Sequence, residues 1–152
     1  MTVWRVSNHA TLDGGGGLRA SHRWHTRGHR IVYCAPNPAT SLLEILVHNE
    51  VDVQDLPRTY QFLEIHLPDS VSLETLDLTS LPTNWKSNGE VTRQTGDAWL
   101  ESMRSALLLV PCVIVPETSN VLINPRHRDS ALASIRQVHH QRLDPRLLKP
   151  GP

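Results

Sequence analysis

Three side chains suited to chemistry lie at almost even spacing near the start of the chain. Arg23, Tyr33 and Glu44 are ten and eleven residues apart, and no other acid lies between Asp13 and Glu44. Guanidinium groups bind phosphate oxygens through charge-assisted hydrogen bonds, and a nearby carboxylate stabilises a transient positive charge. The combination of cations, an aromatic ring and a single acid predicts a site for chemistry on a nucleotide.

Charge is distributed unevenly around these residues. The segment 14–43 contains arginines and no acid, whereas most of the fifteen acids of the chain follow it. Two interpretations remain open, a cationic ligand site or the chance segregation of solvated faces. The formal net charge is zero and the pI is about 7.1, so bulk electrostatics favours neither nucleic acid nor an anionic membrane.

The elements that must position the three residues are a strand and a helix. Residues 31–35 form an apolar run that predicts a buried strand carrying Tyr33, and prolines stop it. Apolar residues then recur at helical spacing over residues 39–49. Ser41, Glu44 and His48 are three and four residues apart, so we expect them to share one face of this helix.

The rest of the chain predicts more strands than helices. Four adjacent glycines at 14–17 favour an exposed loop that approaches a ligand closely, although a plain linker has the same composition. We predict an α+β fold with a mixed sheet, one domain over residues 1–149 and a flexible tail at 150–152. The other expected helices are 97–105, after Gly96, and 128–135; the other expected strands are 3–7, 59–67, 72–78, 107–115, 121–123 and one after residue 135.

Composition and length fit one ordinary globular domain. The chain has 152 residues, of which 39% are hydrophobic and 20% are charged. No apolar run is long enough to cross a bilayer, and the first residues do not resemble a signal peptide. The two cysteines, Cys34 and Cys112, are therefore expected to be free thiols in a reducing cytoplasm.

An ordered set of short fragments runs along almost the whole chain. They are Trp4-Arg5, a glycine-rich stretch, Arg23-Trp24, Gly28, Val32-Tyr33, Ser41-Leu-Leu-Glu44 with His48, Gly96-Asp-Ala-Trp99-Leu, Val110-Pro111-Cys-Val-Ile-Val115, Asn120-Val-Leu-Ile-Asn124-Pro125-Arg-His127 and Asp144-Pro-Arg-Leu-Leu148. Each fragment alone is weak, but the ordered set is specific. It resembles the RES-domain family.

This resemblance implies a fold similar to that of ADP-ribosyltransferases and a role as the toxin of a bacterial type II toxin–antitoxin pair. The implied activity removes nicotinamide from NAD, with inorganic phosphate or water as the acceptor, and so inhibits growth. No further cofactor is implied. The implied partner is an Xre-type helix-turn-helix antitoxin, in a hetero-oligomer that contacts DNA only through the antitoxin.

The resemblance also assigns roles. Cleavage between nicotinamide and ribose passes through an oxocarbenium-like transition state, which Glu44 is expected to stabilise. Nicotinamide leaves as a neutral molecule, so no general acid is needed. Arg5 and Arg23 are expected to bind phosphate groups, and Tyr33 to position nicotinamide by stacking or through its hydroxyl. The remaining arginines of the segment, Arg19, Arg27 and Arg30, are expected at the surface.

Cys112 departs from the family pattern, which has serine after Val-Pro. We expect it beside Arg5, Arg23 and Tyr33 at the substrate. If this position orients Glu44 or a phosphate, a thiol weakens activity because it is a poorer hydrogen-bond donor than a hydroxyl. If it only packs a strand, activity is unchanged. A nucleophilic role is not expected, and the expected role of Asn120, Asn124 and His127 is to fix turns.

Three alternatives stay open. His22, His25 and His29 raise the hypothesis of a zinc site, although no acid accompanies them to orient the rings. The same active centre would also suit transfer of ADP-ribose to a macromolecule. A third alternative is a catalytically weakened member of the family that acts mainly by binding its antitoxin.

Overall fold

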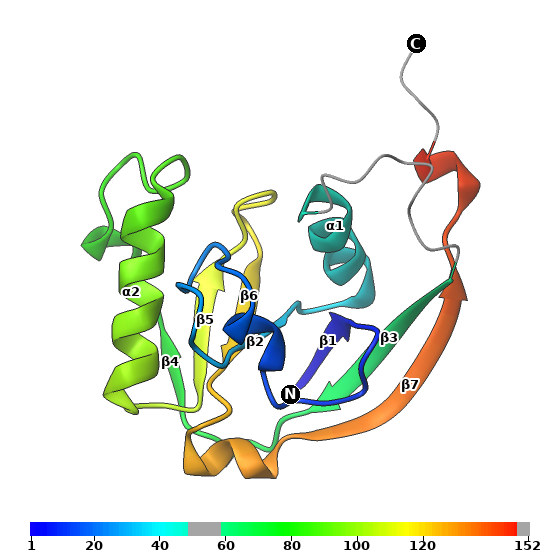
Figure 1. Cartoon of the computed structure of the whole chain (residues 1–152), viewed down its shortest axis with the longest axis horizontal. Helices are drawn as coiled ribbons and strands as arrows, with labels where there is room; N and C mark the ends of the chain where they lie inside the picture. Colours follow the sequence, from blue (N-terminus) through cyan, green and yellow to red (C-terminus); the bar gives the residue numbers. More distant parts are fainter. Residues whose placement is uncertain (49–58, 149–152) are drawn as a thin grey trace.

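The computed structural model describes residues 1–48 and 59–148. Two sheets of mainly antiparallel strands form its centre, and Figure 1 shows them side by side. The tail expected at 150–152 lies outside the described residues, as does residue 49 at the expected end of the first helix. No helix in the described part is long and apolar enough to cross a membrane.

The first sheet has three antiparallel strands in the order β1-β3-β7. The second has four strands in the order β2-β6-β5-β4, with β4 and β5 parallel and the other pairs antiparallel. A bridge between Trp4 and Ala35 joins β1 to the end of β2. The strands are β1 (Thr2–Val6), β2 (Val32–Cys34), β3 (Thr59–His66), β4 (Leu73–Thr75), β5 (Leu107–Pro111), β6 (Ser119–Ile123) and β7 (Ser134–Arg142).

Two α-helices cover these sheets on different sides (Figure 1). α1 (Pro38–His48) packs Leu42, Ile45 and Leu46 against residues of the three-stranded sheet. α2 (Gly89–Ser102) packs Trp99 and Leu100 against the four-stranded sheet. Four short 3₁₀ helices complete the described chain: η1 (Gly15–Leu18), η3 (Leu78–Ser80), η4 (Arg128–Leu132) and η5 (Pro145–Leu148).

The predicted α+β class and mixed sheet are confirmed, and the strand at 31–35 and the helix that carries Glu44 lie where expected. The predicted start of the second helix at residue 97 is wrong. α2 begins at Gly89, where the Asn88 side chain accepts a hydrogen bond from the Val91 amide. Gly96 lies inside this helix and does not mark its end. A glycine is needed there because the helix packs directly against the backbone of Trp24.

Other boundaries differ by a few residues. The strand expected over 72–78 is shorter, because the chain turns into η3. The strand expected over 107–115 ends at Pro111, after which the chain turns back into β6. The glycine run forms the short η1 turn, and the helix expected over 128–135 is the 3₁₀ helix η4.

Candidate functional site

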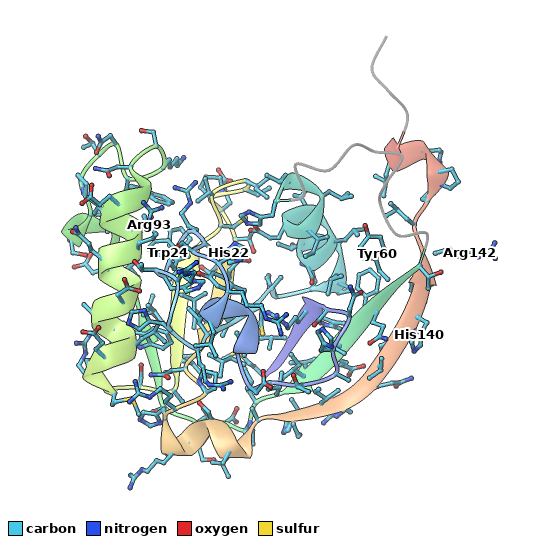
Figure 2. All side chains as sticks on the ribbon, viewed as in Figure 1. His22, Trp24, Tyr60, Arg93, His140 and Arg142 are labelled. Atoms are coloured by element: carbon cyan, nitrogen blue, oxygen red, sulfur yellow. The ribbon has the colours of Figure 1, made fainter. Side chains whose placement is uncertain are left out.

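A cavity of about 330 Å³ lies between α1, the N-terminal end of the chain and the loop that follows η1. This volume is within the range of small-molecule sites, roughly 300–1,000 Å³. Figure 2 shows His22 and Trp24 near this region, in the centre of the molecule between the two α-helices. Its polar lining residues include Arg5, His22, Arg23, His25, Tyr33, Ser41, Glu44, His48 and Asn120.

The helix that supplies the acid begins in a well-defined way. Pro38 occupies the first helical position, which needs no backbone donor, and the Asn37 side chain accepts a hydrogen bond of 2.8 Å from the Thr40 amide. The predicted shared face is confirmed: Ser41, Glu44 and His48 all line the cavity. The local sequence thus fixes which side of α1 faces the site.

Glu44 is held by hydrogen bonds on both carboxylate oxygens. Its Oε1 accepts from Asn120 Nδ2 at 2.6 Å and from Cys112 Sγ at 3.1 Å, while its Oε2 lies 3.3 Å from His48 Nε2. Burial alone raises the pKa of Glu44, but the contacts with His48, Cys112 and Asn120 outweigh it and lower the pKa below its usual value. The carboxylate is therefore ionised at neutral pH and fixed in direction.

Cys112 lies behind the acid and not in the cavity wall. The residue is fully buried, and its thiol donates to Glu44 while accepting from the Val115 amide at 3.4 Å. Burial and the neighbouring carboxylate raise the pKa of this thiol, so it stays protonated and a poor nucleophile. The contact of Cys112 is with Glu44, as expected if this position orients the acid.

The two candidate phosphate-binding arginines line the cavity and donate to backbone carbonyls. Arg5 Nη1 donates to the Tyr33 carbonyl at 3.1 Å, and Arg23 Nη1 donates to the Lys86 carbonyl at 2.9 Å. Among the described residues neither arginine has a carboxylate within 4 Å, and the buried Arg5 Nε has no hydrogen-bond partner. Their charge therefore remains available to an anion in the cavity.

The other arginines of the acid-free segment do not line the cavity. Arg19, Arg27 and Arg30 are exposed, and Arg30 donates to the Asp13 carbonyl at 3.0 Å. This is the surface position expected for them. Of the arginines in the acid-free segment, Arg23 is the one that lines the cavity, and the second cavity arginine, Arg5, comes from β1.

Tyr33 extends from β2 with its hydroxyl group engaged. The hydroxyl accepts a hydrogen bond of 3.1 Å from the Trp24 amide and lies 2.8 Å from His25 Nδ1. Burial raises the pKa of this phenol, so it stays neutral at physiological pH. The ring forms an edge contact with His22 at a centroid distance of 5.9 Å.

Histidines make up a larger part of this site than the sequence argument proposed. The His22 ring lies 5.6 Å from that of His25 and 5.9 Å from that of His48, between centroids. Burial, followed by its charged neighbours, lowers the pKa of His22. His29 instead lies 3.2 Å from Glu101 and 3.4 Å from Asp97, and it does not line the cavity.

Asn120 is the residue whose role the sequence argument missed, because an asparagine in a strand gives no signal of its cross-chain partner. The two other residues of that fragment do fix turns. Asn124 is buried, donates to the Leu100 carbonyl and accepts from the Arg126 amide, and His127 caps η4.

Comparison with known proteins decides the family. The sequence pattern of the RES domain matches residues 2–146. The chain belongs to the RES-domain family. A RES-domain relative named "Toxin Res", from Pseudomonas putida, is 44% identical over 147 residues, which cover 97% of this chain and 99% of the relative. A second relative, the "Prs ADP-ribosylating toxin" of a Sphingobium species, is 38% identical over 158 residues and covers 97% of both chains.

A solved structure shares the RES-domain fold at lower identity. A chain in the crystal structure of the M. tuberculosis MbcT–MbcA toxin–antitoxin complex superposes with a TM-score of 0.73 at 16% identity. The match covers 97% of this chain and 86% of that chain. At this identity the likeness establishes the fold alone.

Proposed function

We propose that this RES-domain protein is the toxin of a toxin–antitoxin pair and cleaves the bond between nicotinamide and ribose in NAD. One observation carries the proposal. The ionised carboxylate of Glu44 is fixed by three contacts at the wall of a cavity that also presents two arginines, and neither arginine has a carboxylate partner among the described residues. A fixed anion beside such cations suits a substrate with a cationic glycosidic bond and an anionic diphosphate.

The reaction needs little proton transfer. As the bond from the ribose carbon to the pyridinium nitrogen breaks, its electron pair goes to nitrogen and nicotinamide leaves neutral. The ribose becomes an oxocarbenium-like cation, which the Glu44 carboxylate stabilises. An oxygen of phosphate then forms a bond to the ribose carbon and gives phosphorylated ADP-ribose; water instead gives ADP-ribose and releases a proton.

The remaining candidate residues bind and orient the substrate. Arg5 and Arg23 hold the diphosphate, and an acceptor phosphate when one is used, because guanidinium groups form paired hydrogen bonds with such oxygens. Tyr33 positions the nicotinamide ring. Cys112 acts through Glu44 and does not touch the substrate. The proposal requires no resident cofactor, since NAD is the substrate and phosphate the co-substrate.

The test is incubation of the purified protein with NAD, with and without phosphate, and separation of the products by mass. The expected products are free nicotinamide and phosphorylated ADP-ribose, or ADP-ribose when phosphate is omitted. Glu44→Gln should lower the rate by about 10²–10³-fold, the usual effect of removing one fixed electrostatic group. Glu101→Gln, at an exposed acid outside the cavity, is the matched control and should keep full activity.

Partner binding is proposed on the same basis. The relatives are named toxins, and the shared fold occurs in a toxin–antitoxin complex. We expect an Xre-type helix-turn-helix antitoxin to bind over the cationic cavity and block NAD cleavage in the cytoplasm. Co-expression with such an antitoxin should restore growth and yield a stable hetero-oligomer; unchanged toxicity and no co-purification would contradict this part.

A second function is favoured by a specific observation, the 38% identical relative named as an ADP-ribosylating toxin. In that reaction the acceptor is a group on a macromolecule, while the cleavage step is the same. NAD labelled in its adenine, incubated with a cell lysate, separates the two. Label retained on protein or nucleic acid supports transfer, whereas label only in small products supports phosphorolysis or hydrolysis.

A further inference from the structure

His25 is a fully buried polar residue that the proposed mechanism has not used. Its side chain is 0% exposed, and Nδ1 lies 2.8 Å from the Tyr33 hydroxyl oxygen. Glycine 17 lies against the opposite ring nitrogen: a Cβ at Gly17 would lie 3.2 Å from His25 Nε2 and would collide with the His29 carbonyl. The backbone therefore packs closely against this ring, and its position is restricted.

The Tyr33 hydroxyl can take part in three hydrogen bonds, one as donor and two as acceptor. The Trp24 amide can only donate, so it occupies one acceptor position. His25 occupies a second position, as donor or as acceptor depending on which ring nitrogen carries the proton. Among the described residues the hydroxyl has these two partners, and since Tyr33 lines the cavity, its third position is open to a bound molecule.

The amide that binds this hydroxyl is itself fixed by α2. A Cβ at Gly96 would overlap the Trp24 carbonyl, so only glycine lets the helix approach this backbone so closely. The Trp24 side chain is 2% exposed and packs in the same cluster as Trp99. Both protein partners of the hydroxyl are thus held by the fold before any substrate binds.

We propose that His25 is a positioning residue, whose hydrogen bond fixes the Tyr33 hydroxyl so that its one remaining hydrogen-bonding position faces the substrate. This rests on the proposed NAD cleavage. Burial lowers the pKa of His25, so the ring is neutral at physiological pH and adds no charge to the cavity. A fixed hydroxyl discriminates between correct and incorrect placement of nicotinamide, which affects the rate of bond cleavage more than substrate affinity.

The test compares two substitutions of His25. In His25→Asn the side-chain amide can still reach the Tyr33 hydroxyl from about the position of Nδ1, whereas His25→Leu fills the space without a hydrogen bond. We expect His25→Leu to lower kcat for NAD cleavage by about 10–100-fold with little change in KM. His25→Asn should stay within about threefold of the wild-type protein. His29→Leu, outside the cavity, is the control and should leave kcat unchanged.

A double substitution shows whether His25 acts through Tyr33. In a Tyr33→Phe background, His25→Leu should cause no further loss of kcat, because the hydroxyl is already absent. The same cycle is measured by unfolding, with the wild-type protein, His25→Leu, Tyr33→Phe and the double variant. The losses in free energy of unfolding caused by the two single substitutions should not add up in the double variant. The proposal would be overturned if His25→Leu kept the wild-type kcat, or if His25→Leu and His25→Asn lost the same amount of kcat. It would also be overturned if the losses of His25→Leu and Tyr33→Phe were fully additive in the double variant.

A different result would contradict the proposed function itself, namely that the wild-type protein releases no nicotinamide from NAD. In that event the unfolding measurements still test the hydrogen bond between His25 and the Tyr33 hydroxyl. Additive losses of unfolding free energy would contradict this hydrogen bond, whereas non-additive losses would support a positioned hydroxyl as a feature of the cavity.

Discussion

Two arginines of the cavity differ from two arginines of the outer surface in what they contact. Arg104 makes two hydrogen bonds with the carboxylate of Glu74, and Arg146 lies 2.7 Å from that of Asp144. Arg5 and Arg23 donate to backbone carbonyls instead. Backbone carbonyls orient a guanidinium without cancelling its charge. Arg104 and Arg146 are thus paired with carboxylates at the surface, whereas in the described part of the chain no carboxylate offsets the charge of Arg5 or Arg23.

The largest effect expected from this difference is on catalysis. Arg23→Ala and Arg5→Ala should each lower kcat/KM for NAD cleavage by about 100-fold, because each removes a charged donor from the cavity wall. Arg104→Ala should leave it unchanged and should cost at most about 1 kcal/mol of stability, as for other exposed ion pairs. Steady-state kinetics and urea unfolding measure both. Equal kinetic losses at Arg23 and Arg104 would remove the distinction.

Two glycines can be compared in a similar way, one packed against the backbone beside the cavity and one with open space around it. Gly96→Ala should lower the free energy of unfolding by about 1–3 kcal/mol, the usual cost of inserting a methyl group into a close contact. NAD cleavage should fall as well, because the Trp24 amide beside Tyr33 must shift. Gly16→Ala, whose Cβ would meet no atom within 4 Å, is the control for the stability measurement; because Gly16 lines the cavity, it is not a control for NAD cleavage. Thermal melts of both variants decide, and an unchanged melting temperature for Gly96→Ala would contradict the packing argument.

A smaller effect concerns pH. The lowered pKa of Glu44 means that its contribution to stability is present above its unfolded pKa, near 4.5, and is lost as the pH falls through the lower folded value. His48→Ala removes one contact that lowers the pKa of Glu44, so the acid limb of the pH–rate profile should move to higher pH. A profile of kcat/KM that extends well below the unfolded pKa of Glu44 would show it; an acid limb at the wild-type position would exclude His48 as a group that lowers the pKa of the Glu44 carboxylate.

The smallest effect is expected at Cys112. Cys112→Ser should raise kcat by about two- to fivefold, because a hydroxyl donates a stronger hydrogen bond to Glu44 than a thiol does. A lower kcat for the serine variant would show that the thiol is matched to its surroundings.

Much of the site could be predicted from the sequence. The helix that carries Glu44 follows from its apolar spacing, and the shared face with Ser41 and His48 follows from helical geometry. What local patterns could not supply are contacts across the chain. Asn120 and Cys112 meet Glu44 because the start of β6 and the turn after β5 lie beside α1, and Arg5 comes from the first strand.

The missed helix start has a similar cause. Gly96 suggests a helix boundary when only its propensity is considered, since glycine costs about 1 kcal/mol inside a helix. A glycine is required at this position because the helix packs against the Trp24 backbone, seventy-two residues earlier in the chain. Likewise His25 looks like one member of a histidine cluster, and only the fold shows that His22 and His25 face the cavity while His29 faces α2.

The partners of Glu44 Oε1 lie 68 and 76 residues further along the chain. Bringing such distant groups together costs loop-closure entropy that only the packed core offsets. A fragment ending with β5 at Pro111 would still contain the arginines, the tyrosine and the acid, yet Glu44 Oε1 would have lost both of its donors. The proposed NAD cleavage therefore depends on the finished domain, and it should disappear with the first cooperative unfolding event.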